Sequence, residues 1–130
     1  MSEAATFVEN FYDSFTQAVM SEEDPAAVID QYYVPGIVQI ADGVELDREQ
    51  LIAHLRPIRK NLVRWRYEVH EALRTGDNLA ARFTIHAQLR KGDPITTDVY
   101  LFGELDPDGR MRRSTQLTRA SSSPSSGGHV

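Results

Sequence analysis

Apolar residues in the first half of the chain recur at helical spacing, and this pattern predicts three helices. Each predicted helix follows a polar residue that can cap its first turn, and the second also has a proline at its first position. The segments are residues 7–20 after Thr6, residues 25–32 after Asp24, and residues 48–58 after Asp47. Pro57 is expected to kink the third helix or to end its regular part.

From Leu62 onward the apolar residues alternate with polar ones, which is the period of a half-buried strand. Four strands are predicted at residues 63–73, 79–89, 95–105 and 111–118, and a short β-prone run at residues 36–41 precedes the third helix. Turn-forming residues join the four strands, so they pair as an antiparallel meander. Helices on one face of such a sheet make an α+β fold. Residues 1–120 are expected to form one domain and residues 121–130 a disordered Ser/Gly/Pro tail.

The register of the strands decides which side chains share a face, because a slip of one residue turns every side chain over. Matching apolar residues across each hairpin sets Leu89 opposite Ile95 and Leu105 opposite Met111. This register predicts three polar pairs: His86 opposite Asp98, His70 opposite Arg82, and Tyr100 opposite Gln116. The face expected to pack on the helices carries Trp65, Tyr67, Val69, Phe83, Ile85, Ala87, Val99, Leu101 and Leu117. The polar face includes His70, Arg82, His86, Asp98, Tyr100, Phe102, Glu104, Arg112 and Gln116.

The predicted pair of His86 and Asp98 is the sharpest chemical feature of the sequence. A carboxylate beside an imidazole selects its tautomer and raises its pKa, which suits general acid–base catalysis. The alternative is a cross-strand charge pair on an outward face, where it would stabilise the sheet by about 0.2–1 kcal/mol. A face that mixes His86 with Tyr100 and Phe102 also suits a dimer interface.

Residues with polar groups on otherwise apolar surfaces are the second set of candidates. Trp65 and Tyr67 each need a hydrogen-bond partner if they are buried. Gln39, Tyr12 and Tyr33 can also point inward. Core packing explains each of these residues singly, whereas several together are typical of a ligand pocket.

Composition excludes some classes of function and argues against others. The chain has 130 residues, no cysteine and a net charge of −5. Disulfides and thiolate chemistry are therefore excluded, and the acidity argues against nucleic-acid binding. Two clusters of basic residues, at positions 56–66 and 110–113, are interpreted as solvated faces.

Membrane-spanning segments, a signal peptide and several common functional motifs are not expected from the sequence. No apolar run approaches the length of a membrane span, and the first residues do not have the pattern of a signal peptide, so a cytoplasmic location is expected. The sequence contains no glycine-rich phosphate loop, no helical histidine pair with metal-binding spacing and no serine elbow.

The order of elements and several short segments resemble the nuclear transport factor 2-like superfamily, in particular its SnoaL-like polyketide cyclase branch. The resemblance covers about residues 7–119 and is carried by residues 7–12, 42–43, 49–52, 98–102 and 108–111. It implies a cone-shaped domain with N-terminal helices packed on a curved antiparallel sheet, a pocket between the two, a homodimer and acid–base chemistry without a cofactor.

The resemblance also bears on single residues. Asp98 stands before an aromatic strand motif, as an aspartate does in the cyclases and the isomerase, whereas counting back from the next turn puts Leu101 there. A β-bulge near Gly103 would reconcile the two alignments. Ile40 stands where the isomerase has its second aspartate, which argues against that activity. Gln116 stands where the epoxide hydrolases have an aspartate, and it can bind or orient a ligand.

The sequence therefore leads to one main hypothesis and two alternatives. The main hypothesis is a cofactor-free enzyme acting on a small, apolar, oxygenated molecule such as a polyketide, with Asp98 and His86 handling protons. Its expected ligand contacts are Tyr12, Gln39, Trp65, Tyr67, Tyr100 and Gln116. The first alternative is a non-catalytic binding or dimerisation module, and the second is a domain that recruits a peptide or protein through the outer face of the sheet.

Overall fold

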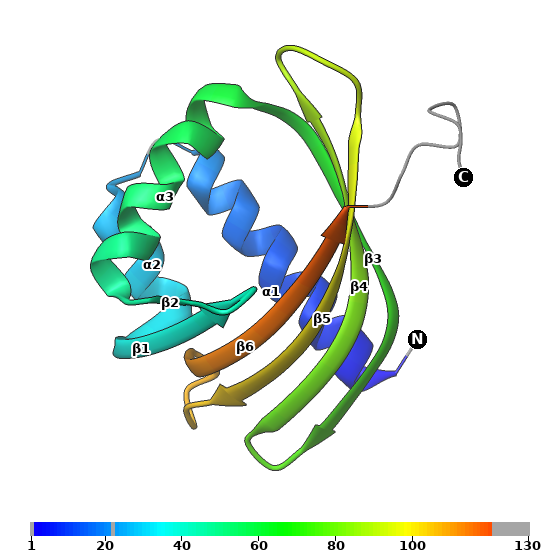
Figure 1. Cartoon of the computed structure of the whole chain (residues 1–130). Helices are drawn as coiled ribbons and strands as arrows, with labels where there is room; N and C mark the ends of the chain where they lie inside the picture. Colours follow the sequence, from blue (N-terminus) through cyan, green and yellow to red (C-terminus); the bar gives the residue numbers. More distant parts are fainter. Residues whose placement is uncertain (1, 22, 121–130) are drawn as a thin grey trace.

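The computed structural model describes residues 2–21 and 23–120, so the predicted tail lies outside the described residues. Three helices and six strands follow one another along the chain (Figure 1). They are α1 (Glu3–Met20), α2 (Pro25–Tyr32), β1 (Tyr33–Ala41), β2 (Val44–Leu46), α3 (Arg48–Asn61), β3 (Leu62–Thr75), β4 (Asn78–Leu89), β5 (Ile95–Leu105) and β6 (Met111–Ala120).

Helices α2 and α3 begin at the predicted residues, although Asp24 makes no side-chain capping hydrogen bond at the start of α2. The Asp47 carboxylate accepts a hydrogen bond from the backbone N–H of Gln50, and the Gln50 side-chain oxygen accepts one from the backbone N–H of Asp47. The predicted cap of α3 is therefore confirmed as a full capping box. Helix α1 starts earlier than predicted and is capped by Ser2 rather than Thr6, because the Ser2 hydroxyl accepts a hydrogen bond from the backbone N–H of Ala5. Pro57 does not end α3, which continues to Asn61 with Pro57 on its exposed side.

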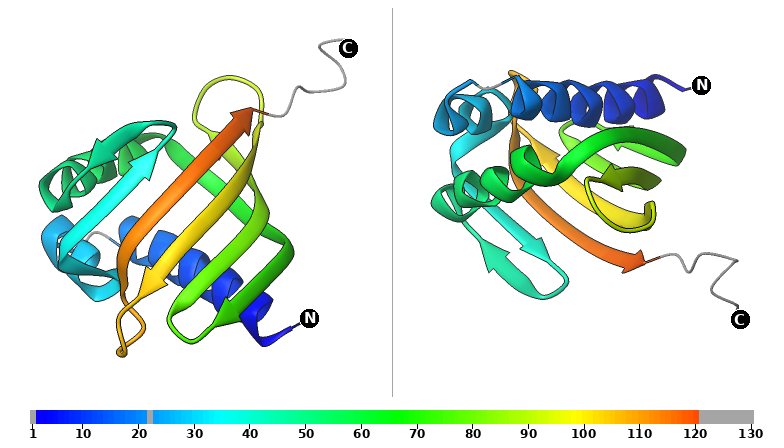
Figure 2. Two further views of the ribbon diagram at one scale, coloured as in Figure 1. Left: turned by 60° about the horizontal axis from the view of Figure 1, so that its bottom comes forward. Right: turned by 90° about the horizontal axis from the view of Figure 1, so that it is seen from above.

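The six strands form one curved sheet in the order β2-β1-β6-β5-β4-β3. The antiparallel meander of β3 to β6 is confirmed. The sheet as a whole is mixed rather than antiparallel, because β1 pairs with β6 in parallel. The hairpin of β1 and the short strand β2 was not predicted. Figure 2 shows α1 lying across one side of the sheet, with the sheet curving around it.

The predicted register is wrong in the hairpin of β4 and β5. Ala87, not Leu89, lies opposite Ile95, so Asp98 faces Thr84 and His86 faces Thr96. Leu89 finds its apolar partner on the other side of β4, where it pairs with Leu62 of β3. The predicted register of this hairpin, which placed Leu89 opposite Ile95, therefore differs from the observed register by two residues.

A β-bulge in β6 changes which of its side chains point to the concave face of the sheet. Leu105 lies opposite Met111 as predicted, but Glu104 lies opposite Arg113, which leaves Arg112 as an extra residue on β6. The predicted bulge near Gly103 is thus located on the neighbouring strand.

Beyond this bulge, the faces of β6 are the reverse of those predicted. Gln116 pairs with the buried Leu101 and shares the concave face with it. Leu117 pairs with Tyr100 and is 60% exposed on the convex face. A second irregularity in β3 sets Glu71, rather than His70, opposite Arg82.

The core fills the space between the concave face of the sheet and the helices. Its most deeply buried large side chains come from every layer: Val8, Val19, Val28, Ile29, Ile37, Leu55, Phe83, Leu101, Leu105 and Met111. This arrangement places α1 and α3 over the same face of the sheet, where the site described below lies.

None of the helices in the described ranges combines the length and the apolar character needed to cross a membrane.

Candidate ligand-binding cavity

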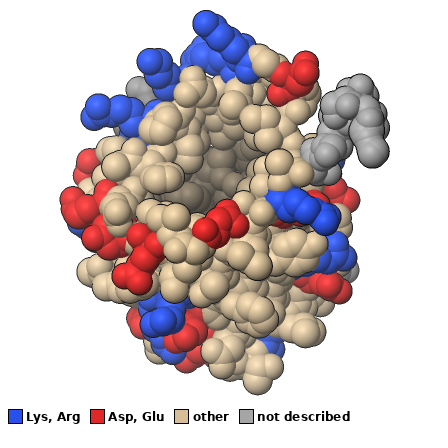
Figure 3. Space-filling view, in the orientation of Figure 1, with Lys and Arg blue, Asp and Glu red and all other residues tan. Residues whose placement is uncertain are grey.

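A deep hollow opens between α3 and the concave face of the sheet. Figure 3 shows this hollow in the orientation of Figure 1, with walls made almost entirely of uncharged residues. In the same orientation α1 crosses behind the opening. The hollow is therefore bounded by α1, α3 and the curved strands, as the pocket of the predicted cone would be.

Polar side chains on β1 and β6 face the concave side together. Gln39 of β1 and Ser114 of β6 pair in register, and the Ser114 hydroxyl donates to the Gln39 Oε1 at 3.3 Å. Gln116 lies two residues further along the same face of β6 and is half-buried. The predicted inward direction of Gln39 is confirmed, and Gln116 faces inward although it was predicted on the polar outer face.

Trp65 and Tyr67 come from the concave face of β3, as predicted. Trp65 is half-buried, and its indole Nε1 donates to the Asp13 carboxylate of α1 at 3.0 Å. The Tyr67 ring packs against Tyr12 of α1 and Phe83 of β4, at centroid distances of 5.8 and 6.2 Å. These contacts join β3 to α1 along one side of the cavity.

The hydroxyl groups of three tyrosines gather at α1. Thr16 donates its hydroxyl proton to the Tyr12 carbonyl at 2.8 Å, so the Tyr67 hydroxyl, 2.6 Å away, donates to the Thr16 oxygen. The phenols of Tyr33 and Tyr67 are near enough to raise the pKa of Tyr12, and the phenol of Tyr67 is near enough to raise the pKa of Tyr33. Within residues 2–21 and 23–120, the hydroxyls of Tyr12 and Tyr33 have no hydrogen-bond partner.

Burial keeps these tyrosines neutral. Loss of hydration raises the pKa of Tyr12, Tyr33 and Tyr67 above the ordinary tyrosine value, and the neighbouring phenols raise it further for Tyr12 and Tyr33. Each hydroxyl therefore stays protonated well above neutral pH and can donate a hydrogen bond. A buried hydroxyl without a partner costs about 1–3 kcal/mol. A carbonyl or hydroxyl oxygen placed beside Tyr12 and Tyr33 would remove that cost.

Asp98 and His86 lie on the convex face of the sheet, and their predicted pairing is wrong. Asp98 accepts hydrogen bonds from Thr84 at 2.8 Å and from Arg119 at 3.1 Å, and these contacts lower the pKa of the Asp98 carboxyl. His86 instead contacts Glu68 at 2.8 Å. The acid–base role of the two residues rested on their pairing and stays a prediction.

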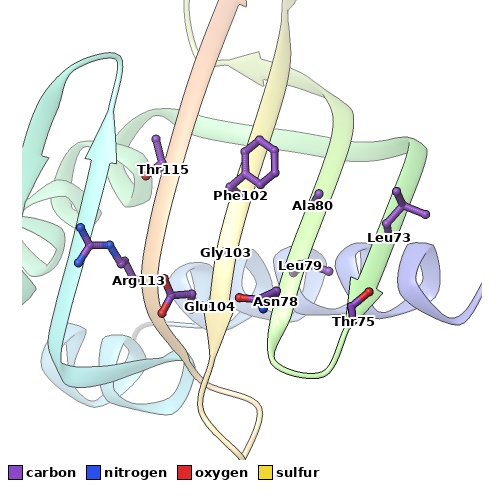
Figure 4. A pocket seen from close by; sticks show the side chains of 10 residues that line it. All are labelled: Leu73, Thr75, Asn78, Leu79, Ala80, Phe102, Gly103, Glu104, Arg113 and Thr115. Atoms are coloured by element: carbon purple, nitrogen blue, oxygen red, sulfur yellow. The ribbon is translucent and has the colours of Figure 1, made fainter.

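Tyr100 also projects from the convex face and is 42% exposed. Its neighbours there are Phe102, which is 71% exposed, and Leu117. A shallow groove runs beside them across β5, β4 and β3, and Figure 4 shows Phe102, Ala80 and Leu73 along it. The ligand contact predicted for Tyr100 would have to be made on this outer surface.

Sequence reasoning missed three polar residues that contact the predicted ones: Asp13, Thr16 and Ser114. Thr16 stands one helical turn after Tyr12, so its position facing the sheet follows from the helical spacing of α1. Asp13 is adjacent to Tyr12 and had no such signal. Ser114 faces inward only because of the bulge in β6.

Comparison with models of protein families shows to which family this chain belongs. The model of the SnoaL-like domain matches residues 8–114. The chain belongs to this family. A comparison with curated protein sequences found no match.

Solved structures similar to this SnoaL-like protein share its fold at low sequence identity. IdmH, a proposed polyketide cyclase from Streptomyces antibioticus, has a TM-score of 0.66 and 14% identity, over 90% of this chain and 92% of that one. A proposed isomerase from Rhodopseudomonas palustris has a TM-score of 0.70 and 13% identity, over 91% of each chain. An NTF2-like protein of unknown function from Exiguobacterium has a TM-score of 0.67 and 16% identity, over 87% of this chain and 98% of that one. The fold is therefore NTF2-like, as the sequence resemblance implied.

Proposed function

We propose that this SnoaL-like protein binds a small, largely apolar molecule that carries oxygen atoms, in the cavity between α1, α3 and the concave face of the sheet. The observation that carries the proposal is the pair of buried hydroxyls on Tyr12 and Tyr33, which have no partner among the described residues. Ligand sites are mostly apolar with a few placed polar groups, and this cavity has that character. The proposed polyketide cyclase among the similar structures supports an oxygenated, polyketide-like ligand.

A second candidate function is catalysis on such a molecule, of the cyclase, isomerase or hydrolase type and without a cofactor. Neutral phenol donors aimed at a carbonyl oxygen can stabilise negative charge that develops there. A base is also required, and the half-buried carboxylate of Asp13 is near enough to Tyr67 to raise its pKa. The proton-transfer roles of Asp98 and His86 would instead require the substrate to reach the convex face.

Removal of the Tyr33 hydroxyl tests the binding proposal. Tyr33→Phe is expected to weaken binding of naphthol by about three- to tenfold, the effect of one hydrogen bond, and to leave naphthalene binding unchanged. Calorimetric titration of both probes measures the difference. Because the hydroxyl has no partner in the unliganded protein, the melting temperature should stay the same or rise.

The matched control is the neighbouring tyrosine. The Tyr32 phenol lies near Ser14 and Glu23 rather than near Tyr12 or Tyr67, so Tyr32→Phe should leave the affinity for naphthol unchanged. Equal loss of naphthol and naphthalene binding in Tyr33→Phe would show a packing effect and contradict hydroxyl recognition. Failure of the unaltered protein to bind either probe would contradict the proposed ligand class.

We also propose that the convex face of the sheet is the interface of a homodimer. The exposed apolar residues of this face are Leu73, Tyr100, Phe102 and Leu117, with exposed fractions of 42–75%. Such a continuous apolar surface favours association with another protein surface, and the groove lined by Leu73, Ala80 and Phe102 lies within it (Figure 4). The groove can receive side chains from a second copy.

Substitution of Phe102 tests the interface. Phe102→Glu is expected to shift the protein from dimer to monomer at micromolar concentration, because it places two charges in an apolar contact. Sedimentation equilibrium measures the mass. Val44→Glu on β2 removes a residue that is 58% exposed at the far edge of the sheet, and it should leave the mass unchanged. A monomeric unaltered protein, or a dimer that survives Phe102→Glu, would rule out this interface.

A further inference from the structure

The two clusters of basic residues in the sequence differ in whether their side chains form ion pairs with carboxylates. Of the two basic clusters in the sequence, the one at residues 110–113 is largely neutralised: Arg110 pairs with Asp108, and Arg112 pairs with Glu104 and Asp106. The cluster at residues 56–66 forms no ion pair with any carboxylate of the described residues. In a protein with a net charge of −5, carboxylates are plentiful, so this difference is informative.

The β4–β5 hairpin brings two further cations, Arg90 and Lys91, to the end of α3, where Lys60 lies. The backbone N–H of Arg90 donates to the Asn61 carbonyl at 2.8 Å, and its Nε donates to the Lys60 carbonyl at 2.6 Å. These bonds join the β4–β5 hairpin to the end of α3. Between them lies a groove lined by Lys60, Asn61, Leu89, Arg90 and Lys91.

The charge of this groove is strongly positive. Lys60, Arg90 and Lys91 form no ion pair with a carboxylate in the described ranges. Asp93 is the carboxylate on the same hairpin, and it forms no ion pair with the described residues either. The last turn of a helix favours cations, which explains Lys60 on α3. It does not explain why the hairpin brings two more cations to the same place.

The groove lies beside the opening of the cavity. Figure 3 shows Lys and Arg side chains gathered along the top edge of the face that contains the hollow, over the end of α3 and the β4–β5 hairpin of Figure 1. Leu89 of the groove follows Ala87 on β4, and Ala87 pairs with the cavity residue Trp65. The apolar wall of the cavity therefore continues to the groove along β4.

We infer that the ligand of the cavity is amphiphilic, with an apolar, oxygenated body inside and an anionic group, a carboxylate or a phosphate, held by Lys60, Arg90 and Lys91. This inference rests on the proposed function. The cations would attract such a ligand over a distance of about 8 Å at physiological salt and would orient it with its charged end outward. The tyrosine hydroxyls would then contact the oxygen at its other end.

The test compares a charged and an uncharged form of one probe. The probe is ω-hydroxydodecanoate, which has a hydroxyl at one end and a carboxylate at the other, and its uncharged form is the methyl ester. Quenching of Trp65, the only tryptophan of the chain, reports binding. The carboxylate is expected to bind about tenfold more tightly than the ester at about 0.1 M salt, and the preference should largely disappear at about 1 M salt.

Charge-removing variants locate the anion site. The double variant Lys60→Gln/Lys91→Gln should lose the preference for the carboxylate and keep the affinity for the ester. Arg74→Gln/Arg113→Gln removes two cations that also lack ion pairs in the described residues but lie elsewhere, and it should keep the preference.

The outcomes separate this inference from the proposed function. Equal binding of carboxylate and ester, with sensitivity to Tyr33→Phe, would overturn the anion site and leave the cavity proposal standing. Loss of preference in both double variants would show a general effect of net charge and would also overturn the anion site. Binding of neither probe, together with no binding of naphthol, would overturn both.

Discussion

Replacement of Phe83 by alanine is expected to lower the free energy of unfolding by about 3–5 kcal/mol, the largest single effect predicted for this chain. Phe83 is 2% exposed at the centre of the concave face. Its ring packs against Tyr12 at a centroid distance of 5.0 Å and against Tyr67 at 6.2 Å. The substitution therefore removes a large buried side chain and leaves a void beside Tyr12 and Tyr67. Urea unfolding followed by circular dichroism measures the loss.

Two further variants make the Phe83 prediction specific. Phe83→Leu keeps most of the buried volume and should be clearly less destabilising than the alanine variant. Val63→Ala shortens a residue that is 49% exposed on β3, and it should change stability by no more than about 0.5 kcal/mol. A loss below about 1 kcal/mol for Phe83→Ala would mean that this position does not anchor α1 to the sheet.

Gly103→Ala is expected to destabilise the protein by about 1–3 kcal/mol, although it adds a single methyl group. A Cβ at position 103 would lie 2.7 Å from the Met111 Sδ and 3.3 Å from its Cε. Met111 is fully buried, so its side chain has little room to move away. The conflict lies beside the bulge of β6, where the register that turns Gln116 inward is set.

A double-mutant cycle checks the cause of the Gly103 effect. If the clash with Met111 is responsible, Gly103→Ala should cost less when Met111 is already shortened to valine, so the two effects will not add. Gly36→Ala is the control, because a Cβ at position 36 has no neighbour within 4 Å. Strict additivity in the cycle would refute the proposed contact.

Local rules were sufficient for most of the elements. Asp47 followed by Gln50 predicted the start of α3, and alternation of apolar residues predicted β3 to β6, because capping and pleating depend on residues close in sequence. Parts of the site followed in the same way. Tyr12 lies on the apolar stripe of α1, and Tyr67 lies on the apolar phase of β3, so both were predicted to point inward.

The predicted pair that the structure contradicts depended on the register of the strands. His86 and Asp98 were paired on the assumption that Leu89 matches Ile95, whereas Leu89 pairs with Leu62 of a different hairpin. The inward position of Gln116 depends on Arg112, an extra residue that no local pattern marks. A register derived from the apolar residues of one hairpin does not take into account that a residue of that hairpin can pair with a third strand, as Leu89 does with Leu62.

By itself, the sequence determined that this chain forms an α+β domain with a long β meander and an aromatic inner face, because helix caps, turns and hydrophobic period are local properties. Only the tertiary structure decided which polar groups meet. It placed the hydroxyls of Tyr12, Tyr33 and Tyr67 near one another, and it moved Asp98 away from His86. It also joined Lys60 to the hairpin of Lys91. These contacts join segments distant in sequence, and their geometry depends on sheet curvature, bulges and the parallel pairing of β1 with β6, which form only when the whole chain packs.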